Sequence, residues 1–268
     1  MALDFNSIGP IGLLGAGRMG GALIEGWARA GAINPADLII IEPHPSDAIK
    51  AVGARLNLPS GELAQVRTLL LAVKPQVWKA AAADVAAHLA PDAVIVSIAA
   101  GVALADIAAA FGGRRVARVM PTTAVSIGKG VASIYAPDLE AHARAHALFA
   151  PVATTVDLAH ESLMHAATAV SGSAPAYLYA FIEALEGAGV KAGLSEKAAR
   201  RLARATIAGA GALLEASGEE PAELRRQVTS PGGTTQAALE VLMGQGGLGD
   251  LLESAVAAAV RRSQDLGG

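Results

Sequence analysis

The chain contains no cysteine among its 268 residues. Disulfide bonds, thiolate metal sites and a cysteine nucleophile are therefore excluded. Aromatic residues make up only 3% of a composition that is 53% hydrophobic, which favours close-packed, alanine-rich helices over a sandwich of large side chains. The net charge is -3, and no run of lysine or arginine is longer than two residues. We therefore expect a small-molecule ligand and no nucleic-acid partner.

Charged residues (Asp, Glu, Lys, Arg) are absent from Ser162 to Ile182. We expect no membrane span here, because the stretch contains His165 and a helix-breaking Ser-Gly-Ser-Ala-Pro cluster at 171–175. A helix buried between two subunits suits this composition better. The segment Met1–Pro10 has no basic part followed by an apolar core, so we expect no secretory signal and a cytoplasmic location.

A glycine-rich run near the N-terminus is typical of dinucleotide-binding sites. An apolar strand pattern from Ile11 leads into G-x-G-x-x-G at Gly15, Gly17 and Gly20, and a helical stretch follows. The first glycine of such a motif forms a tight turn, the second lets a pyrophosphate approach the backbone, and the third brings helix and strand together. A second apolar strand ends at Glu42, about 20 positions later, where a carboxylate binds the ribose hydroxyls. This order predicts a Rossmann site.

Strand and helix patterns alternate over the first part of the chain, which indicates a parallel sheet with its ligand at the carboxyl ends of the strands. From about His160 the strand patterns stop and only helices are predicted. We therefore expect an α/β Rossmann-like N-terminal domain, residues 1–159, followed by an all-α C-terminal domain for substrate binding and dimerisation, residues 160–268. Strands are predicted at 38–42, 68–73, 94–98 and 115–119, with edge strands at 130–135 and 154–157 around a helix at 139–149.

A second motif lies in the helical part, where Ser230 to Thr235 read Ser-Pro-Gly-Gly-Thr-Thr before an apolar helical pattern. Backbone N–H groups at a helix N-terminus, together with hydroxyl groups, hold a small anion without a charged side chain. The run is therefore a candidate carboxylate cradle. The alternative is an ordinary turn with a threonine N-cap.

Other chemistries find less support. Ser171-Gly172-Ser173 lacks the G-x-S-x-G frame of a hydrolase elbow. His142 and His146 have the i, i+4 spacing of zinc ligands, but no third ligand is evident in the sequence, so we expect no metal site. Lys74 ends an apolar strand on the cofactor side, and both a functional and an ordinary exposed lysine remain open.

Taken in order, these motifs resemble the pyrroline-5-carboxylate reductase family, whose members catalyse the last step of proline synthesis. The match rests on short runs that span nearly the whole chain, the most specific being Ser-Pro-Gly-Gly-Thr-Thr. The matching runs are Ile11–Gly20, Ala72–Pro75, Ser97–Val102, Arg118–Pro121, Ala169–Tyr177 and Ser230–Thr235.

The resemblance implies hydride transfer from NAD(P)H to the cyclic imine 1-pyrroline-5-carboxylate. It implies that Ser230 and the backbone of Gly233 and Thr234 hold the substrate carboxylate, that Thr235 is the catalytic contact to the ring nitrogen, and that Glu161 lies beside the substrate. It also implies a homodimer with intertwined helical domains and a site shared between subunits, and a higher oligomer of dimers is open. The cofactor-contacting residues that it implies are Leu14, Gly15, Ala16, Gly17, Arg18, Met19, Glu42, Ala72, Val73, Lys74, Pro75, Ile98, Ala99, Ala100 and Gln227.

The sequence departs from the family pattern at Thr122, where an asparagine is usual, at Ala124, where a proline is usual, and at Ala174, where a glycine is usual. Two rival functions stay open: the N-terminal part also resembles the beta-hydroxyacid dehydrogenase group of oxidoreductases, and the departures at Thr122 and Ala174 suggest a non-catalytic nicotinamide-binding module. The first uses a catalytic lysine at the start of the helical domain, and Ser171 to Glu183 contains none.

The turn after the second strand bears on the choice of cofactor. It reads Glu42-Pro43-His44-Pro45 and contains no arginine, and Lys50 is the nearest lysine. Because an acid at this position repels a 2′-phosphate and binds free ribose hydroxyls, we expect a preference for NADH over NADPH.

Overall fold

The computed structural model describes residues 5–267 and divides them into two compact units. The first unit comprises the chain up to Gly172 together with the end of the last helix from Ala259, and the second comprises Ser173–Ala258. The first unit therefore runs past residue 159, where the sequence predicted a domain boundary. That boundary stays a prediction.

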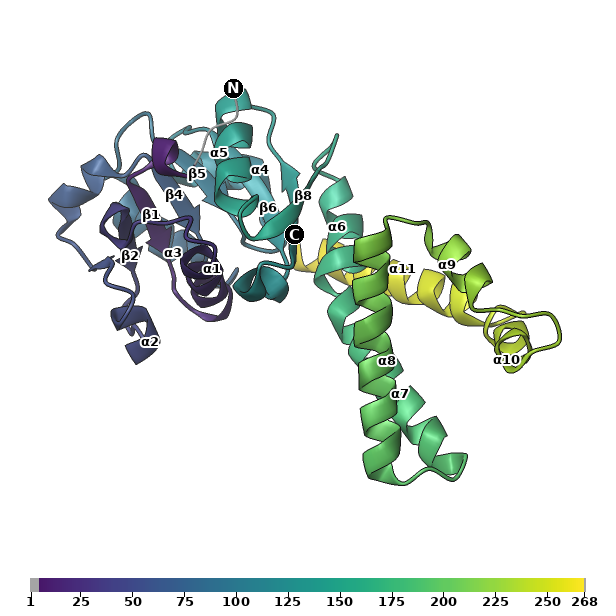
Figure 1. Ribbon diagram of the computed structural model, residues 1–268. Coiled ribbons are helices and arrows are strands. Elements are labelled where there is room, and N and C mark those ends of the chain that lie inside the picture. The colour runs from purple at the N-terminus through teal and green to yellow at the C-terminus, as the bar shows by residue number, and fades with distance from the viewer. Residues whose placement is uncertain (1–4, 268) are drawn as a thin grey trace. The chain divides into compact units, whose positions relative to one another are not determined.

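A sheet forms the centre of the first unit (Figure 1). Within the described residues it has eight strands, in the order β3-β2-β1-β4-β5-β6-β7-β8. Neighbouring strands from β3 to β6 are parallel. The order reverses between β1 and β4, which creates the switch point at which ligands bind in such sheets. The strands are β1 Ile11–Leu14, β2 Leu38–Ile41, β3 Arg55–Leu56, β4 Thr68–Leu71, β5 Val94–Ser97, β6 Val116–Pro121, β7 Gly130–Tyr135 and β8 Ala153–Asp157.

Alternate residues of the central strands enter two apolar cores, one on each face of the sheet. In β4, Leu70 packs in one core and Leu69 and Leu71 in the other, as the period of two in a strand requires. The first core contains side chains of α1 (Arg18–Arg29) and α5 (Leu139–Phe149), and the second contains side chains of α3 (Trp78–Ala86) and α4 (Leu104–Ala110). Helices thus cover both faces, as expected for a doubly wound domain.

The parallel sheet predicted from the alternating strands is confirmed from β3 to β6, and the next strand along the chain, β7, pairs antiparallel with β6. Only the short 3₁₀ segment η4, Thr123–Ile127, joins them, and a parallel crossover needs a longer connection. The remaining short elements of the first unit are η1 Asn6–Ile8, η2 Pro35–Asp37, α2 Asp47–Lys50, η3 Ser60–Gln65, α6 Leu163–Ala167 and the π-helical turn η5 Thr168–Gly172.

The second unit is helical, as predicted. Two of its helices, α7 (Ala174–Lys191) and α8 (Glu196–Ser217), pack against each other (Figure 1). They approach closely at Gly189, where a Cβ atom would lie 3.2 Å from that of Ala199. The other helices are α9 Pro221–Gln227, α10 Thr234–Leu242 and α11 Leu248–Gly267, the last of which extends into the first unit. No helix in the described part of the chain has the length and hydropathy needed to cross a bilayer.

Candidate active site

A cleft of about 650 Å³ lies at the switch point of the sheet. The loops after β1 and β4 border it, held by hydrogen bonds from the Gly15 amide to the Ile41 carbonyl and from the Ala72 amide to the Leu14 carbonyl, at 2.9 and 2.8 Å. Its lining is mostly apolar, with Arg18, Glu42, Lys74 and Asp84 as the charged residues. This composition suits a ligand with a flat apolar part and a few polar groups.

The three glycines of the loop have the separate tasks that the motif predicts. Gly15 has φ +96°, and a Cβ there would lie 2.8 Å from Cγ1 of Val73. A Cβ at Gly20 would overlap the carbonyl oxygen of Gly15, so only glycine lets the helix approach the loop. Around Gly17 no atom lies within 4 Å of the Cβ position, which leaves the backbone open toward a ligand. The loop therefore fits a pyrophosphate at the N-terminus of α1.

Glu42 is positioned at the end of β2 by hydrogen bonds on both its backbone and its side chain. The Glu42 amide donates to Oδ1 of Asn57, and Nδ2 of Asn57 donates to the Glu42 carbonyl, each at 2.9 Å. The carboxylate accepts the Ala16 amide at 2.9 Å and the His44 amide at 3.1 Å. The acid thus reaches the glycine loop, where a ribose hydroxyl can compete for the same oxygens.

A second cavity of about 670 Å³ adjoins this acid and shares Gly17, Arg18 and Glu42 with the cleft. His44 and Ser46 also line it. Lys50 forms an ion pair with Asp47, in which its Nζ lies 3.0 Å from Oδ1.

Most predicted cofactor residues line the cleft, and a few do not. Ala16 lines the second cavity, whereas Pro75, Ala99 and Ala100 line neither. Gln227 lies in α9 of the second unit, where its Nε2 donates to Oε2 of Glu219 at 2.6 Å. The predicted cofactor residues that line the cleft are Leu14, Gly15, Gly17, Arg18, Met19, Glu42, Ala72, Val73, Lys74 and Ile98.

Sequence reasoning missed one wall of the cleft. Val77, Ala80, Ala81, Asp84 and Val85, in or next to α3, all line it. Their spacing of three and four positions places them on one helical face, a signal that could have been found once α3 was assigned to the cofactor side. Ile41, Pro43, Met120 and Pro121 also line the cleft.

Thr122, one of the departures from the family pattern, has a clear structural role. Its amide donates to the Val131 carbonyl at 2.9 Å, and its hydroxyl accepts the Val131 amide at 3.0 Å. The residue is buried and joins the end of β6 to β7, and it does not line the cleft. The threonine therefore closes the antiparallel pair.

Glu161 forms a partly buried ion pair. Its Oε1 accepts Nη1 of Arg118 at 2.6 Å and the Leu104 amide at 2.7 Å. The Arg118 side chain is only 7% exposed and that of Glu161 33%. The carboxylate thus compensates a buried charge and satisfies the first turn of α4. A further cavity beside the pair is lined by Gly101, Ala103, Ser162, His165 and Gln264.

The carboxylate cradle begins the helix α10. Gly232 has φ +69°, and the Gly233 amide closes the turn on the Ser230 carbonyl at 3.0 Å. Gly233 is the N-cap residue and no side chain caps the helix, so the amides of Thr234 and Thr235 point out of its first turn. Gln236, which sequence reasoning missed, holds the turn because its Oε1 accepts the Gly232 amide at 2.7 Å.

The strand order, glycine loop and acid after β2 define a dinucleotide-binding protein of the Rossmann class. Residues 10–101 match the family model described as NADP oxidoreductase, coenzyme F420-dependent, and residues 161–266 match that for pyrroline-5-carboxylate reductase dimerisation. Pyrroline-5-carboxylate reductases from Synechocystis sp. and Pseudomonas aeruginosa are 39% and 38% identical, each over 96% of this chain and over 98% and 96% of their own lengths. The chain belongs to the pyrroline-5-carboxylate reductase family.

Solved structures agree with this assignment. The pyrroline-5-carboxylate reductase of Coxiella burnetii has a TM-score of 0.89 at 27% identity, covering 97% of this chain and 99% of its own. The Plasmodium falciparum pyrroline carboxylate reductase, solved with NADP bound, has a TM-score of 0.81 at 27% identity, covering 96% and 98%. The protein is thus an oxidoreductase with a Rossmann-like domain and a helical dimerisation domain, and it forms a homo-oligomer.

Proposed function

We propose that this protein reduces 1-pyrroline-5-carboxylate to L-proline with NAD(P)H, the last step of proline biosynthesis. The observation that carries the proposal is a dinucleotide cleft and a Ser-Pro-Gly-Gly-Thr-Thr helix N-terminus in one chain, similar over 96% of its length to reductases of this name. A reduced nicotinamide supplies the hydride, and the protein binds and orients the substrate.

The chain's own residues then act mainly by positioning. The Ser230 hydroxyl and the amides of the first turn of α10 hold the substrate carboxylate, with Gly233 allowing the close approach of the backbone. The Thr235 hydroxyl accepts a hydrogen bond from the protonated ring nitrogen. Because an iminium carbon already attracts hydride, no general base is required at this step. Glu161 and Gln227 stay in the proposal as residues beside the substrate and the cofactor.

The cofactor fits the cleft on observations of this structure. The open space at Gly17 accepts a pyrophosphate, and the Glu42 carboxylate lies within hydrogen-bond distance of the loop that holds it. Cofactor contacts at Pro75, Ala99 and Ala100 remain part of the proposal. A cytoplasmic location also belongs to the proposal, and fractionation of cells that express the tagged chain checks it.

The assay is proline formation from the imine, with oxidation of NADH or NADPH followed in parallel. The rival dehydrogenase function predicts turnover of hydroxy acids, and the binding-module alternative predicts cofactor binding without turnover. Proline formation at a rate that depends on Thr235 supports the proposal. Cofactor binding without any imine reduction would refute it.

We further propose a preference for NADH over NADPH. The Glu42 carboxylate is held against the glycine loop by the Ala16 amide, which supports a contact with the ribose hydroxyls, and Lys50 is paired with Asp47. The expected result is a higher kcat/KM for NADH, and Glu42→Gln should narrow the difference by removing the charge that repels a 2′-phosphate. A clear NADPH advantage in the wild-type enzyme would mean that Glu42 points away from the ribose and would refute this preference.

A further inference from the structure

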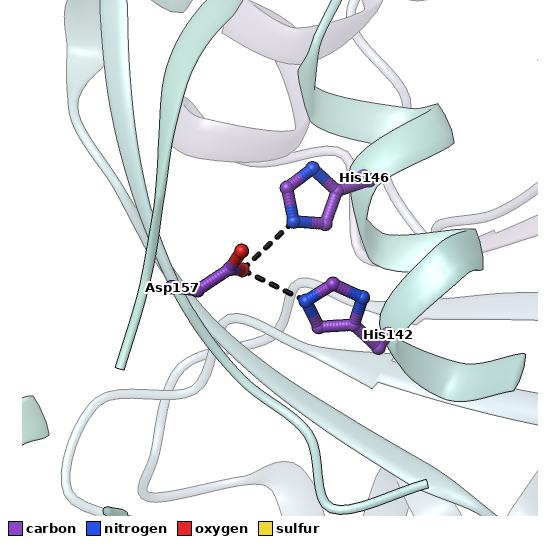
Figure 2. A group of neighbouring side chains, drawn as sticks. All are labelled: His142, His146 and Asp157. Atoms are coloured by element: carbon purple, nitrogen blue, oxygen red, sulfur yellow. Dashed lines mark hydrogen bonds and ion pairs between the residues drawn. The ribbon is translucent and has the colours of Figure 1, made fainter. Parts of the chain in front are cut away.

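Two histidines and an aspartate converge on the outer part of the first unit. Nε2 of His142 lies 2.9 Å from Oδ1 of Asp157, and Nε2 of His146 lies 2.8 Å from the same oxygen (Figure 2). One ligand atom from each side chain lies within 4.8 Å of the other two. Among the described residues, no other group of three or more His, Asp or Glu side chains converges in this way.

The fold brings this cluster together. His142 and His146 are one helical turn apart in α5, so both rings leave the same face of the helix, with centroids 4.5 Å apart. Asp157 is the last residue of the edge strand β8. Buried alanines next to the histidines, Ala141 and Ala145, anchor the same helix in the core.

The cluster carries negative charge on its oxygen ligand. Oδ1 of this carboxylate lies within 2.9 Å of Nε2 of both rings. An anionic oxygen between two imidazole nitrogens is a donor set that attracts a divalent cation.

The donor types select the class of cation. Calcium and magnesium prefer oxygen ligands, whereas imidazole suits zinc, copper, iron and nickel. In a tetrahedral zinc site with bonds of 2.0–2.2 Å, ligand atoms are about 3.3 Å apart. The Nε2 to Oδ1 distances of 2.8 and 2.9 Å need to open by only a few tenths of an ångström. The Asp157 side chain, which is 55% exposed, is free to make that adjustment.

We propose that His142, His146 and Asp157 bind a divalent first-row transition-metal ion, with Zn²⁺ as the best fit and water as the fourth ligand. Each ring then coordinates through Nε2 and keeps its proton on Nδ1. The ion links α5 to the edge strand β8, so its effect is to stabilise the first unit. None of the three residues lines the cofactor cleft, so the ion takes no part in hydride transfer. The structure thus supplies the third ligand that the sequence did not reveal.

The test is Zn²⁺ binding to the EDTA-treated full-length protein, measured by isothermal titration calorimetry and by thermal unfolding. We expect one ion per chain and a higher Tm with Zn²⁺, because an ion that binds only the folded state stabilises it. Removing one ligand with His142→Ala or His146→Ala should weaken binding at least about tenfold. Co²⁺ should give the strong visible absorption of a tetrahedral site.

Two further variants make the result decisive. Asp157→Asn keeps an oxygen that accepts hydrogen bonds from both rings but is a poor metal ligand, so it should fold without metal and lose the Zn²⁺ response. The control is His88→Ala, which removes an exposed histidine outside the cluster and should bind Zn²⁺ like the wild type. Equal Zn²⁺ binding by the wild type, Asp157→Asn and His146→Ala would overturn the proposal. The three side chains would then form only a hydrogen-bonded contact between α5 and β8.

Discussion

At the scale of single residues, the proposed chemistry depends most on Thr235. Its side chain belongs to the first turn of α10 and is half-buried, next to the amides of the carboxylate cradle. Thr235→Val removes the hydroxyl with little change in volume. We expect a loss of roughly 1.5 to 3 kcal/mol of transition-state stabilisation, read from kcat/KM for the imine, because a hydrogen bond to a charged partner is lost.

The control for Thr235→Val is the affinity for the dinucleotide, which should hardly change, because the cofactor cleft is built from the Rossmann-like domain. Thr235→Ser, which restores a hydroxyl, should recover much of the activity. Full activity in the valine variant would remove Thr235 from the mechanism.

A substitution at Glu161 should change the stability of the fold. Glu161→Ala leaves Arg118 buried without its carboxylate and deprives the Leu104 amide of its acceptor. We expect a loss of about 2 to 3 kcal/mol in the free energy of unfolding, below the value for a fully buried pair because Glu161 is one-third exposed. Chemical denaturation measures it. An unchanged midpoint would mean that water replaces the carboxylate at no cost.

At the scale of elements, two glycines in the turn from β1 to α1 allow an effect on folding to be distinguished from an effect on cofactor binding. Gly20→Ala places a methyl group against the Gly15 carbonyl and should cost about 1 to 3 kcal/mol of stability. Gly17→Ala meets no protein atom and should fold normally, but its methyl group occupies the space of the pyrophosphate. We expect its KM for the cofactor to rise roughly tenfold or more. Gly20→Ala should therefore lower Tm, whereas Gly17→Ala should leave Tm unchanged and raise the KM for the cofactor.

At the scale of the whole molecule, the helical domain of a single chain leaves large apolar side chains exposed to solvent. No residue of α7 is buried within the chain, and Leu178, Phe181 and Leu185 are among its exposed large side chains. Their spacing of three and four places them along one helical face. A dimerisation domain accounts for this face, because a second copy can cover it.

We expect light scattering to show at least a dimer, and Phe181→Asp with Leu185→Asp to dissociate it with loss of activity. The matched control is Leu139→Asp, which places the same charge at an exposed leucine of the first unit and should leave the assembly intact. A stable monomer with full activity would contradict both the homo-oligomer and a site shared between subunits. The same light-scattering measurement shows whether dimers associate into a larger assembly.

By itself the sequence determined the features that depend on local spacing. The strands other than the two-residue β3, the glycine loop with Glu42, the helical second half and the Ser230–Thr235 run were predicted, because period-two and helical patterns and turn residues act over a few neighbours. The family resemblance came from the same short runs, and comparison with relatives confirmed it.

Only the tertiary structure decided which distant groups meet. The sequence could not show that Glu42 reaches the Ala16 amide, that Arg118 pairs with Glu161, or that Asp157 joins His142 and His146. It also did not show that β7 turns antiparallel to β6. Each of these contacts depends on how elements far apart in the sequence pack against each other. Spacing along the chain does not reveal which of their residues then lie close together.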